Sequence, residues 1–307
     1  MVINENKKDA CILHLVILIL KVLIMNVLEI ANKIKNIGFT SLNQILTEED
    51  LNKRLKFLNH KIPKSPKATF PINFSQYFLK LLKLDFSKLK QTLILKKIAK
   101  DLKLKEISDE VYGMETELHM IDSYYSEKSE KDIITWHNDL GINEEFSKFE
   151  KKKEYFIDKA KATLNNEKTS QSPRGLKFFI YLTEVHSNNG ALAVIPNSND
   201  IVKTISKLIL EKKIPVLPFW NLQSLRKLLK DNKIKNLATE YIQKDRIENF
   251  LDQSKFIDDE KKDTNIFDLE MKKGSMIIFD ELCVHRGSAP KNNSRIVLRY
   301  LFRKKIK

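Results

Sequence analysis

The chain has 307 residues, 42% of them hydrophobic, which is enough to bury the core of one large domain. This composition excludes disordered and fibrous proteins. The formal net charge of +15 comes almost entirely from lysine, because only eight of the 55 basic residues are arginine. We therefore interpret the charge as a solvated surface and expect no nucleic-acid partner. The two cysteines exclude a disulfide framework and a cysteine-based zinc site, so a reduced, cytoplasmic setting is expected.

The most apolar stretch is residues 11–30, but two charged and two polar side chains interrupt it. A transmembrane helix needs about 20 largely uncharged residues, and a signal peptide needs a small-residue cleavage site. The stretch meets neither requirement well. Three interpretations stay open: a buried helix, a membrane-surface anchor, or an extension upstream of a natural start at Met25. We favour the third, so residues 1–24 are expected to be an apolar extension outside the native protein, and no membrane association is expected.

Residues 25–110 are predicted to form a helical layer that packs against a sheet. Its first helix begins after Met25, ends at Gly38, and has one apolar face made by Val27, Leu28, Ala31, Ile34 and Ile37. Residues 47–105 are also predicted to be helical, with a capping start at Thr47 to Asp50 and a Pro- and Lys-rich break at 61–71. No metal-ligand or nucleophile pattern occurs in this layer.

Strand patterns follow, at residues 117–125, 176–183, 191–196, 274–280 and 294–302. The sequence Asn188-Asn189-Gly190 is predicted to turn the second strand into the third. Two long, charged insertions, 140–173 and 200–262, have helical patterns. The order predicts an α+β fold, with a double-stranded β-helix (jelly-roll, cupin-like) core at 111–307 and the N-terminal and inserted helices outside it. We expect residues 25–307 to form one domain.

A candidate metal site begins with His137 and Asp139, which are two residues apart. On an extended strand both side chains point to the same face. Roughly 0.8 such His-x-acid pairs are expected by chance in this composition, so the pair needs support from elsewhere. Support comes from His285, which is followed ten residues later by Arg295 at the head of an apolar strand. Two histidines and one carboxylate form a facial triad that holds iron(II) and leaves coordination positions open.

From Trp136 to Phe302 the chain resembles the phytanoyl-CoA dioxygenase family of iron(II)- and 2-oxoglutarate-dependent oxygenases. The resemblance lies in three blocks: WHND at 136–139, LKFFIYLTEVHSNNGALAVIPNSN at 176–199 and GSMIIFDELCVHRGSAPKNNSRIVLRYLF at 274–302. It covers just over half of the chain. The sequence departs from the family in having Pro196-Asn197-Ser198-Asn199 where Pro-Gly-Ser-His is usual, and in a slightly short loop between His285 and Arg295.

The resemblance implies roles for individual residues. The implied iron ligands are His137, Asp139 and His285. Arg295 would receive the distal carboxylate of 2-oxoglutarate, because a planar guanidinium can pair two-pronged with a carboxylate. Ser288 would add a hydroxyl to the same carboxylate. Arg299 lies on the same face of its strand as Arg295, and remains an alternative to it.

The resemblance also implies an activity: an Fe(II)- and 2-oxoglutarate-dependent dioxygenase that uses O2, hydroxylates its substrate, and releases succinate and CO2. Asp139 favours hydroxylation, because halogenating relatives are expected to lack this carboxylate. A small-molecule or lipid-like substrate is expected, and the Lys-rich insertions with apolar stripes favour an anionic one. Two other classes stay open: a non-catalytic jelly-roll ligand-binding protein, and a nucleic-acid demethylase of the alkylation-repair type. The oligomeric state is left open.

Overall fold

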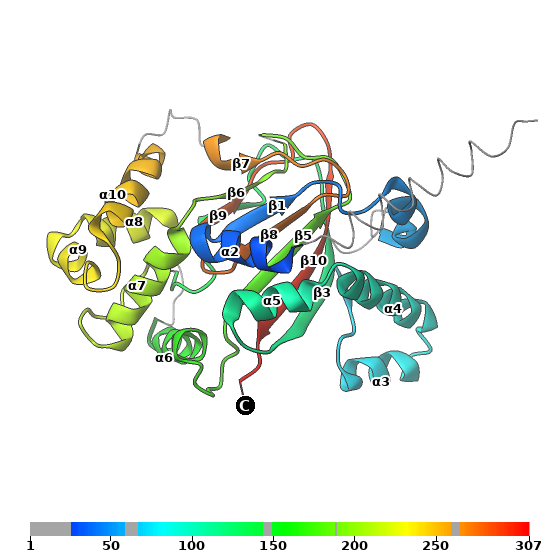
Figure 1. Cartoon of the computed structure of the whole chain (residues 1–307), viewed down its shortest axis with the longest axis horizontal. Coiled ribbons are helices and arrows are strands. Elements are labelled where there is room, and N and C mark those ends of the chain that lie inside the picture. The colour runs from blue at the N-terminus through cyan, green and yellow to red at the C-terminus, as the bar shows by residue number, and fades with distance from the viewer. Residues whose placement is uncertain (1–25, 59–66, 144–148, 188, 259–264, 307) are drawn as a thin grey trace, which may run out of the picture.

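A computed structural model describes residues 26–58, 67–143, 149–187, 189–258 and 265–306. The predicted extension, residues 1–24, lies outside these ranges. Two antiparallel sheets form the centre of the molecule, with helices on their outer faces (Figure 1). The α+β class and the double-sheet, jelly-roll core are therefore confirmed. Within the described ranges, no helix combines the length and apolar character that crossing a bilayer requires.

The larger sheet has six strands in the order β1-β8-β5-β10-β3-β2. These are β1 (Phe39–Leu42), β2 (Lys67–Phe70), β3 (Thr116–Ser126), β5 (Gly175–Tyr181), β8 (Met276–Asp280) and β10 (Arg295–Lys304). Strand β5 is buried on both faces. Phe178 and Ile180 pack toward the N-terminal helices, whereas Phe179 and Tyr181 pack into the space between the two sheets. The continuous apolar pattern of this strand follows from that double burial.

The smaller sheet has four short strands in the order β4-β9-β6-β7. They are β4 (Ile134–His137), β6 (Leu192–Val194), β7 (Asp268–Leu269) and β9 (His285–Gly287). His137 on β4 lies directly opposite His285 on β9. The sheet therefore brings together two residues that are distant in the sequence.

The two strands predicted at residues 176–183 and 191–196 do not pair with each other. The chain does turn here, and the amide of Asn189 donates to the His186 carbonyl at 2.9 Å. However, β5 belongs to the larger sheet, whereas β6 pairs with β7 and β9 in the smaller one. Gly190 has a φ of +79°, a conformation that glycine adopts easily, and its connection crosses from one sheet to the other.

The N-terminal segment contains α2 (Val27–Ile37), α3 (Phe74–Leu82), α4 (Phe86–Asp101) and α5 (Leu104–Tyr112). Helix α2 confirms the prediction made from its apolar face, and it ends at Gly38, whose φ is +92° and whose amide donates to the Ile34 carbonyl at 2.8 Å. The prediction of a fully helical layer is wrong, because β1 and β2 lie within residues 25–110. Both are edge strands of the larger sheet: β1 pairs with β8, and β2 pairs with β3.

Helix α3 also departs from a layer packed on a sheet, because none of its residues is buried. Its neighbour α4 buries Leu95 and Ile98 against the core. The two helices form a hairpin at one side of the molecule (Figure 1). An apolar helix face is thus left exposed there.

Helices occupy both predicted insertions. They are α6 (Phe149–Ala160) in the first, and α7 (Ser198–Leu210), α8 (Leu222–Lys230), α9 (Asn232–Ala238) and α10 (Lys244–Gln253) in the second. Figure 1 shows them gathered on the side opposite the α3–α4 hairpin. Their apolar faces form one cluster with Trp136, Ala193 and Val284 of the smaller sheet region. The insertions therefore support the outer side of the sheet that carries the two histidines.

Candidate active site

The two histidines are held in the same way. His137 Nδ1 lies 2.7 Å from the Thr135 carbonyl oxygen, and His285 Nδ1 lies 2.8 Å from the Cys283 carbonyl oxygen. A carbonyl can only accept, so each Nδ1 carries the proton and each Nε2 keeps a lone pair. The ring centroids are 4.3 Å apart, and both side chains are buried. Both imidazoles are thus oriented as metal ligands are.

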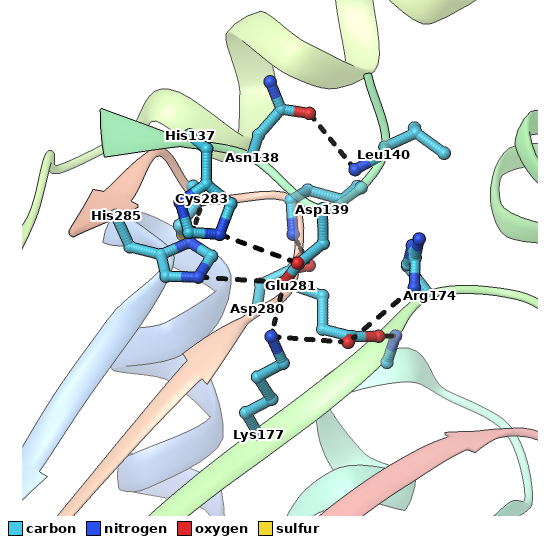
Figure 2. Close-up of polar contacts among 12 residues, drawn as sticks. His137, Asn138, Asp139, Leu140, Arg174, Lys177, Asp280, Glu281, Cys283 and His285 are labelled. Atoms are coloured by element: carbon cyan, nitrogen blue, oxygen red, sulfur yellow. Dashed lines mark hydrogen bonds and ion pairs between the residues drawn. The ribbon is translucent and has the colours of Figure 1, made fainter. Parts of the chain in front are cut away.

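Asp139 completes a cluster with these two rings. Its Oδ1 lies 3.8 Å from His137 Nε2, and its Oδ2 lies 3.7 Å from His285 Nε2 (Figure 2). One ligand atom from each of the three residues can be chosen so that all lie within 4.8 Å of one another. Atoms that bind one first-row metal ion lie about 3 Å apart, so small side-chain rotations would suffice. The cluster can hold a metal ion.

The protonation states also suit metal binding. Burial, and then the proximity of His137, lower the pKa of His285 to about 3. Burial likewise lowers the pKa of His137. Burial raises the pKa of Asp139, but Lys177 and His285 outweigh it and hold that pKa well below its usual range. Neutral imidazoles beside an ionised carboxylate are the forms that coordinate metals.

Asn138, between the two motif residues, fixes the turn that carries Asp139. Its Nδ2 donates to the carbonyls of Phe219 and Trp220 at 2.7 and 3.1 Å, and its Oδ1 accepts from the amides of Leu140 and Gly141 at 3.1 and 2.7 Å. This buried amide is therefore well satisfied. The sequence motif indicated no role for Asn138, although an Asn that precedes a turn is a signal for such bonding.

Lys177 and Glu281 are further site residues that sequence reasoning missed. Lys177 Nζ lies 2.5 Å from Asp139 Oδ2 and 3.6 Å from Glu281 Oε1 (Figure 2). Glu281 Oε2 accepts from the Gly175 amide at 2.9 Å. Lys177 is the one charged residue in the apolar stretch 175–182, and a buried charge of this kind is a functional signal.

Arg295 shares a cavity of about 290 Å³ with the three clustered residues. It is buried and donates to the Gly190 carbonyl at 3.0 Å, while its Nε has no hydrogen-bond partner among the described residues. Burial lowers its pKa, and the groups that oppose this shift are Tyr181 and Tyr124 rather than carboxylates. Arg295 is therefore a buried cation that a ligand carboxylate could satisfy.

Arg299 lines the same cavity but is already engaged. Its Nε and Nη2 donate to the two carboxylate oxygens of Asp122 at 2.9 and 2.6 Å. Ser288 is buried, and its hydroxyl has no hydrogen-bond partner among the described residues, but it does not line the cavity. Of the three residues considered as partners of a dicarboxylate, Arg295 has the geometry that fits best.

No protein-family model matches this chain, and no curated protein does either. Solved structures give distant likenesses. The non-heme α-ketoglutarate-dependent epimerase SnoN from nogalamycin biosynthesis is 9% identical over 91% of this chain and 82% of that one, with a TM-score of 0.46. HygX from Streptomyces hygroscopicus, with nickel and 2-oxoglutarate bound, is 10% identical over 90% of this chain and 86% of that one, with a TM-score of 0.44. EctD from S. alaskensis is 13% identical over 89% of this chain and 75% of that one, with a TM-score of 0.45. These likenesses are too distant to indicate what this chain does.

Proposed function

We propose that the protein is an iron(II)- and 2-oxoglutarate-dependent oxygenase. The observation that supports this most is that His137, Asp139 and His285 offer ligand atoms within 4.8 Å of one another. His137, Asp139 and His285 would hold the metal through Nε2 and carboxylate oxygens. Such a triad suits non-heme iron(II) and leaves positions for other ligands.

The co-substrate assignment follows from the chemistry of the cavity. Its volume of about 290 Å³ suits a small dicarboxylate, and Arg295 offers a buried guanidinium in the same space as the triad. Arg295 would bind the distal carboxylate of 2-oxoglutarate, and Ser288 would need to turn toward the cavity to assist it. Iron(II) with 2-oxoglutarate and O2 supplies the oxidation of a substrate C–H bond, with release of succinate and CO2.

The chain's own residues position and protect this site. The Thr135 and Cys283 carbonyls hold the imidazole orientations, and Asn138 holds the turn that carries Asp139. The burial of both histidines keeps bulk water from the imidazole nitrogens. These contacts preorganise the ligands before any metal binds.

The finer assignments belong to the same proposal. Asp139 favours hydroxylation over halogenation, since a halide would need its position on the metal. The blocks at 136–139, 176–199 and 274–302 support a relationship to the phytanoyl-CoA dioxygenase family. The proposed substrate is a small molecule or lipid-like. Residues 25–307 would form one oxygenase domain, and the protein would be located in the cytoplasm.

Anaerobic titration of the full chain with iron(II) and 2-oxoglutarate would test this proposal. We expect one iron(II) per chain, a visible charge-transfer band when 2-oxoglutarate is added, and loss of both in His285→Ala, because two ligands make a poor site. His186→Ala is the matched control, since the side chain of this exposed histidine pairs with Glu184, at 3.8 Å, and lies outside the cluster. Full iron occupancy in His285→Ala would refute the site. A wild-type chain that binds neither ligand would instead favour the non-catalytic binding protein.

A further inference from the structure

A second cavity, of about 500 Å³, adjoins the candidate metal site and shares Asp139 with it. In the view of Figure 2, Arg174 and the two histidines lie on opposite sides of Asp139. The cavity is lined by the turn after β4, by one face of α6, by Arg174 and by Trp220. A ligand in this space would therefore lie beside the metal site without occupying the Arg295 cavity.

Positive charge is in excess around this cavity. Among the described residues, four cations of low exposure lie around two carboxylates here: Lys159, Arg174, Lys177 and Arg303 around Asp139 and Glu281. A fifth cation, Lys152, also lines the cavity and has an interaction partner of its own. Three of the four cations share Glu281, at 3.6 to 4.0 Å. If Asp139 also bound a metal dication, Glu281 alone would remain to offset them. Buried charges without a counter-charge are costly, so the region is suited to an incoming anion.

Two of these cations face the cavity directly. Lys159 Nζ lies 3.1 Å from the Asp139 main-chain carbonyl and 4.9 Å from the centroid of the Tyr155 ring. Burial and the nearby Arg174 lower the pKa of Lys159 to about 7, so a bound anion would favour its protonated form. Arg174 reaches Glu281 only at 4.0 Å, and its Nε has no hydrogen-bond partner among the described residues. Among the described residues, neither cation has a close carboxylate like the one that Asp122 offers to Arg299. Both side chains therefore keep hydrogen-bonding capacity for a ligand.

Asn143 and Lys152 also line the cavity, and its other walls are apolar or aromatic. They are formed by Leu140, Ile142, Tyr155, Phe156 and Trp220. Trp220 also lies 4.9 Å from the His137 ring, between centroids, so this wall reaches the candidate metal site. A ligand that satisfies the whole cavity needs an anionic group and an apolar or aromatic body.

We propose that this second cavity binds the substrate, and that the substrate is an organic anion whose charged group lies on Lys159 and Arg174 and whose apolar or aromatic body lies on Trp220 and Phe156. Its role as a substrate site rests on the proposed oxygenase function, but anion binding does not. The charged group can be a carboxylate or a phosphate, because both accept hydrogen bonds from ammonium and guanidinium groups.

Calorimetric titration of the metal-free full chain tests the proposal with 4-phenylbutyrate, phenyl phosphate and the uncharged 4-phenylbutanamide. We expect at least one of the two anions to bind about tenfold more tightly than the amide, and Lys159→Gln with Arg174→Gln to remove this advantage. The better anion identifies the charged group. Lys227→Gln, on an exposed position of α8, controls for the loss of one positive charge. Equal binding of anions and amide, or an unchanged preference in the double variant, would overturn the proposal.

Two further variants test which of the two cavities binds the anion, and whether the positive charge of Arg174 is sufficient for binding. Arg295→Gln should keep the preference for the anion, whereas its loss there would place the probe in the 2-oxoglutarate cavity and overturn the assignment. Arg174→Lys keeps the charge and should restore most of the affinity lost in Arg174→Gln. Nickel(II) affinity, measured on the same variants, checks that the turn carrying Asp139 is intact.

The two proposals can fail separately. If the chain binds no iron(II) but still binds the anion through Lys159 and Arg174, the oxygenase function fails and the anion site stands. If iron(II) and 2-oxoglutarate bind and the anion preference is absent, the oxygenase function stands and the anion site fails.

A second, independent feature is the apolar surface of the α3–α4 hairpin. Its exposed apolar residues are Phe74, Phe78, Leu79, Leu81, Leu82, Leu84, Phe86 and Leu93, and Phe74 is 84% exposed. Helix α3 buries no residue against the rest of the described chain. So many exposed apolar side chains on two neighbouring helices are unusual on a protein that works without a partner, and they indicate an interaction site.

The charges around the hairpin indicate what it binds. Residues 74–93 contain four lysines and one acidic residue, Asp85. A second copy of the same surface would bring like charges together, whereas an anionic lipid surface would attract them. We infer that the hairpin docks on an anionic membrane surface, with Phe74, Phe78 and Leu82 in the lipid interface. This inference departs from the expectation of no membrane association.

Co-sedimentation with vesicles of phosphatidylcholine, with and without phosphatidylglycerol, tests this inference. We expect binding only to the anionic vesicles, and a loss of about tenfold or more when Phe74, Phe78 and Leu82 are all replaced by Ser. Ile266→Ser is the control, because Ile266 is 67% exposed and lies outside the hairpin. Equal binding to both vesicle types would overturn the inference. So would a dimer in solution that the triple variant dissociates, since the occupant would then be a second copy.

Discussion

At the scale of residues, Arg295 and Arg299 line one cavity but differ in their hydrogen bonds. Because Arg295 has hydrogen-bonding capacity left, Arg295→Gln should raise the KM for 2-oxoglutarate by about tenfold to a hundredfold and leave iron(II) affinity unchanged. Steady-state assays of succinate release measure the first, and anaerobic titration measures the second. A normal KM in this variant would remove Arg295 from the proposed mechanism.

Arg299 should instead affect the stability of the fold. Arg299→Gln removes the two-pronged cation that faces the buried Asp122 carboxylate, which should cost about 3 kcal/mol of the free energy of unfolding. Urea denaturation measures this cost, and the KM for 2-oxoglutarate in the surviving folded enzyme should change little. If Arg299→Gln raised the KM and Arg295→Gln did not, the two roles would be reversed.

What the sequence could predict at this scale depends on local spacing. His137 and Asp139 share a motif, and the structure brings His285 to them as the sequence reasoning expected. Lys177 and Glu281 carry no motif, because their relation to Asp139 arises from pairing between β5 and β8 and from the turn that follows β8. Their roles could not be derived without the register of the strands.

At the scale of elements, the segment that leads into α8 lies against the candidate metal site. The backbone amide of Asn138 donates to the Trp220 carbonyl at 2.9 Å, and Asn221 forms an isolated β-bridge with His137. The segment thus continues the small sheet beyond β4. It also supplies Trp220 to the second cavity, so the 200–262 insertion contributes to both the frame and the pocket.

Phe219 and Trp220 of this segment should therefore respond differently to replacement by Ala. Phe219 is fully buried against Phe156, with ring centroids 5.5 Å apart, so Phe219→Ala should cost about 3–5 kcal/mol of stability. Trp220→Ala should leave stability and iron(II) binding nearly unchanged, and uncouple succinate release from substrate oxidation. Unchanged coupling in Trp220→Ala would show that substrate selection lies elsewhere.

Element prediction succeeded where a pattern was local and failed where a partner decided the outcome. The apolar face and Gly38 were sufficient for α2. By contrast, β1 and β2 are four residues each and owe their extended form to neighbouring strands. The apolar pattern of β5 indicated its strand type but could not show that β6, the next strand in the chain, belongs to the other sheet.

At the scale of the whole molecule, metal binding should stabilise the fold. Nickel(II) at about 100 times its Kd should raise the free energy of unfolding by about 2.7 kcal/mol, provided that it binds the folded chain alone. The melting temperature, measured with and without nickel(II), reports this gain. His285→Ala should show no gain, and an equal rise in this variant would indicate binding outside the triad.

The pairing of β4 with β9 has a consequence for how the chain closes. Residues 137 and 285 are about 150 positions apart, so an ion bound by both would cross-link the two ends of a very long loop. The strands that it joins have four and three residues, whereas β3 and β10 of the larger sheet have eleven and ten. Removing the ion should therefore speed hydrogen exchange at the amides of β4 and β9 while those of β3 and β10 stay protected. The affinity for the metal would then depend on whether the smaller sheet has formed.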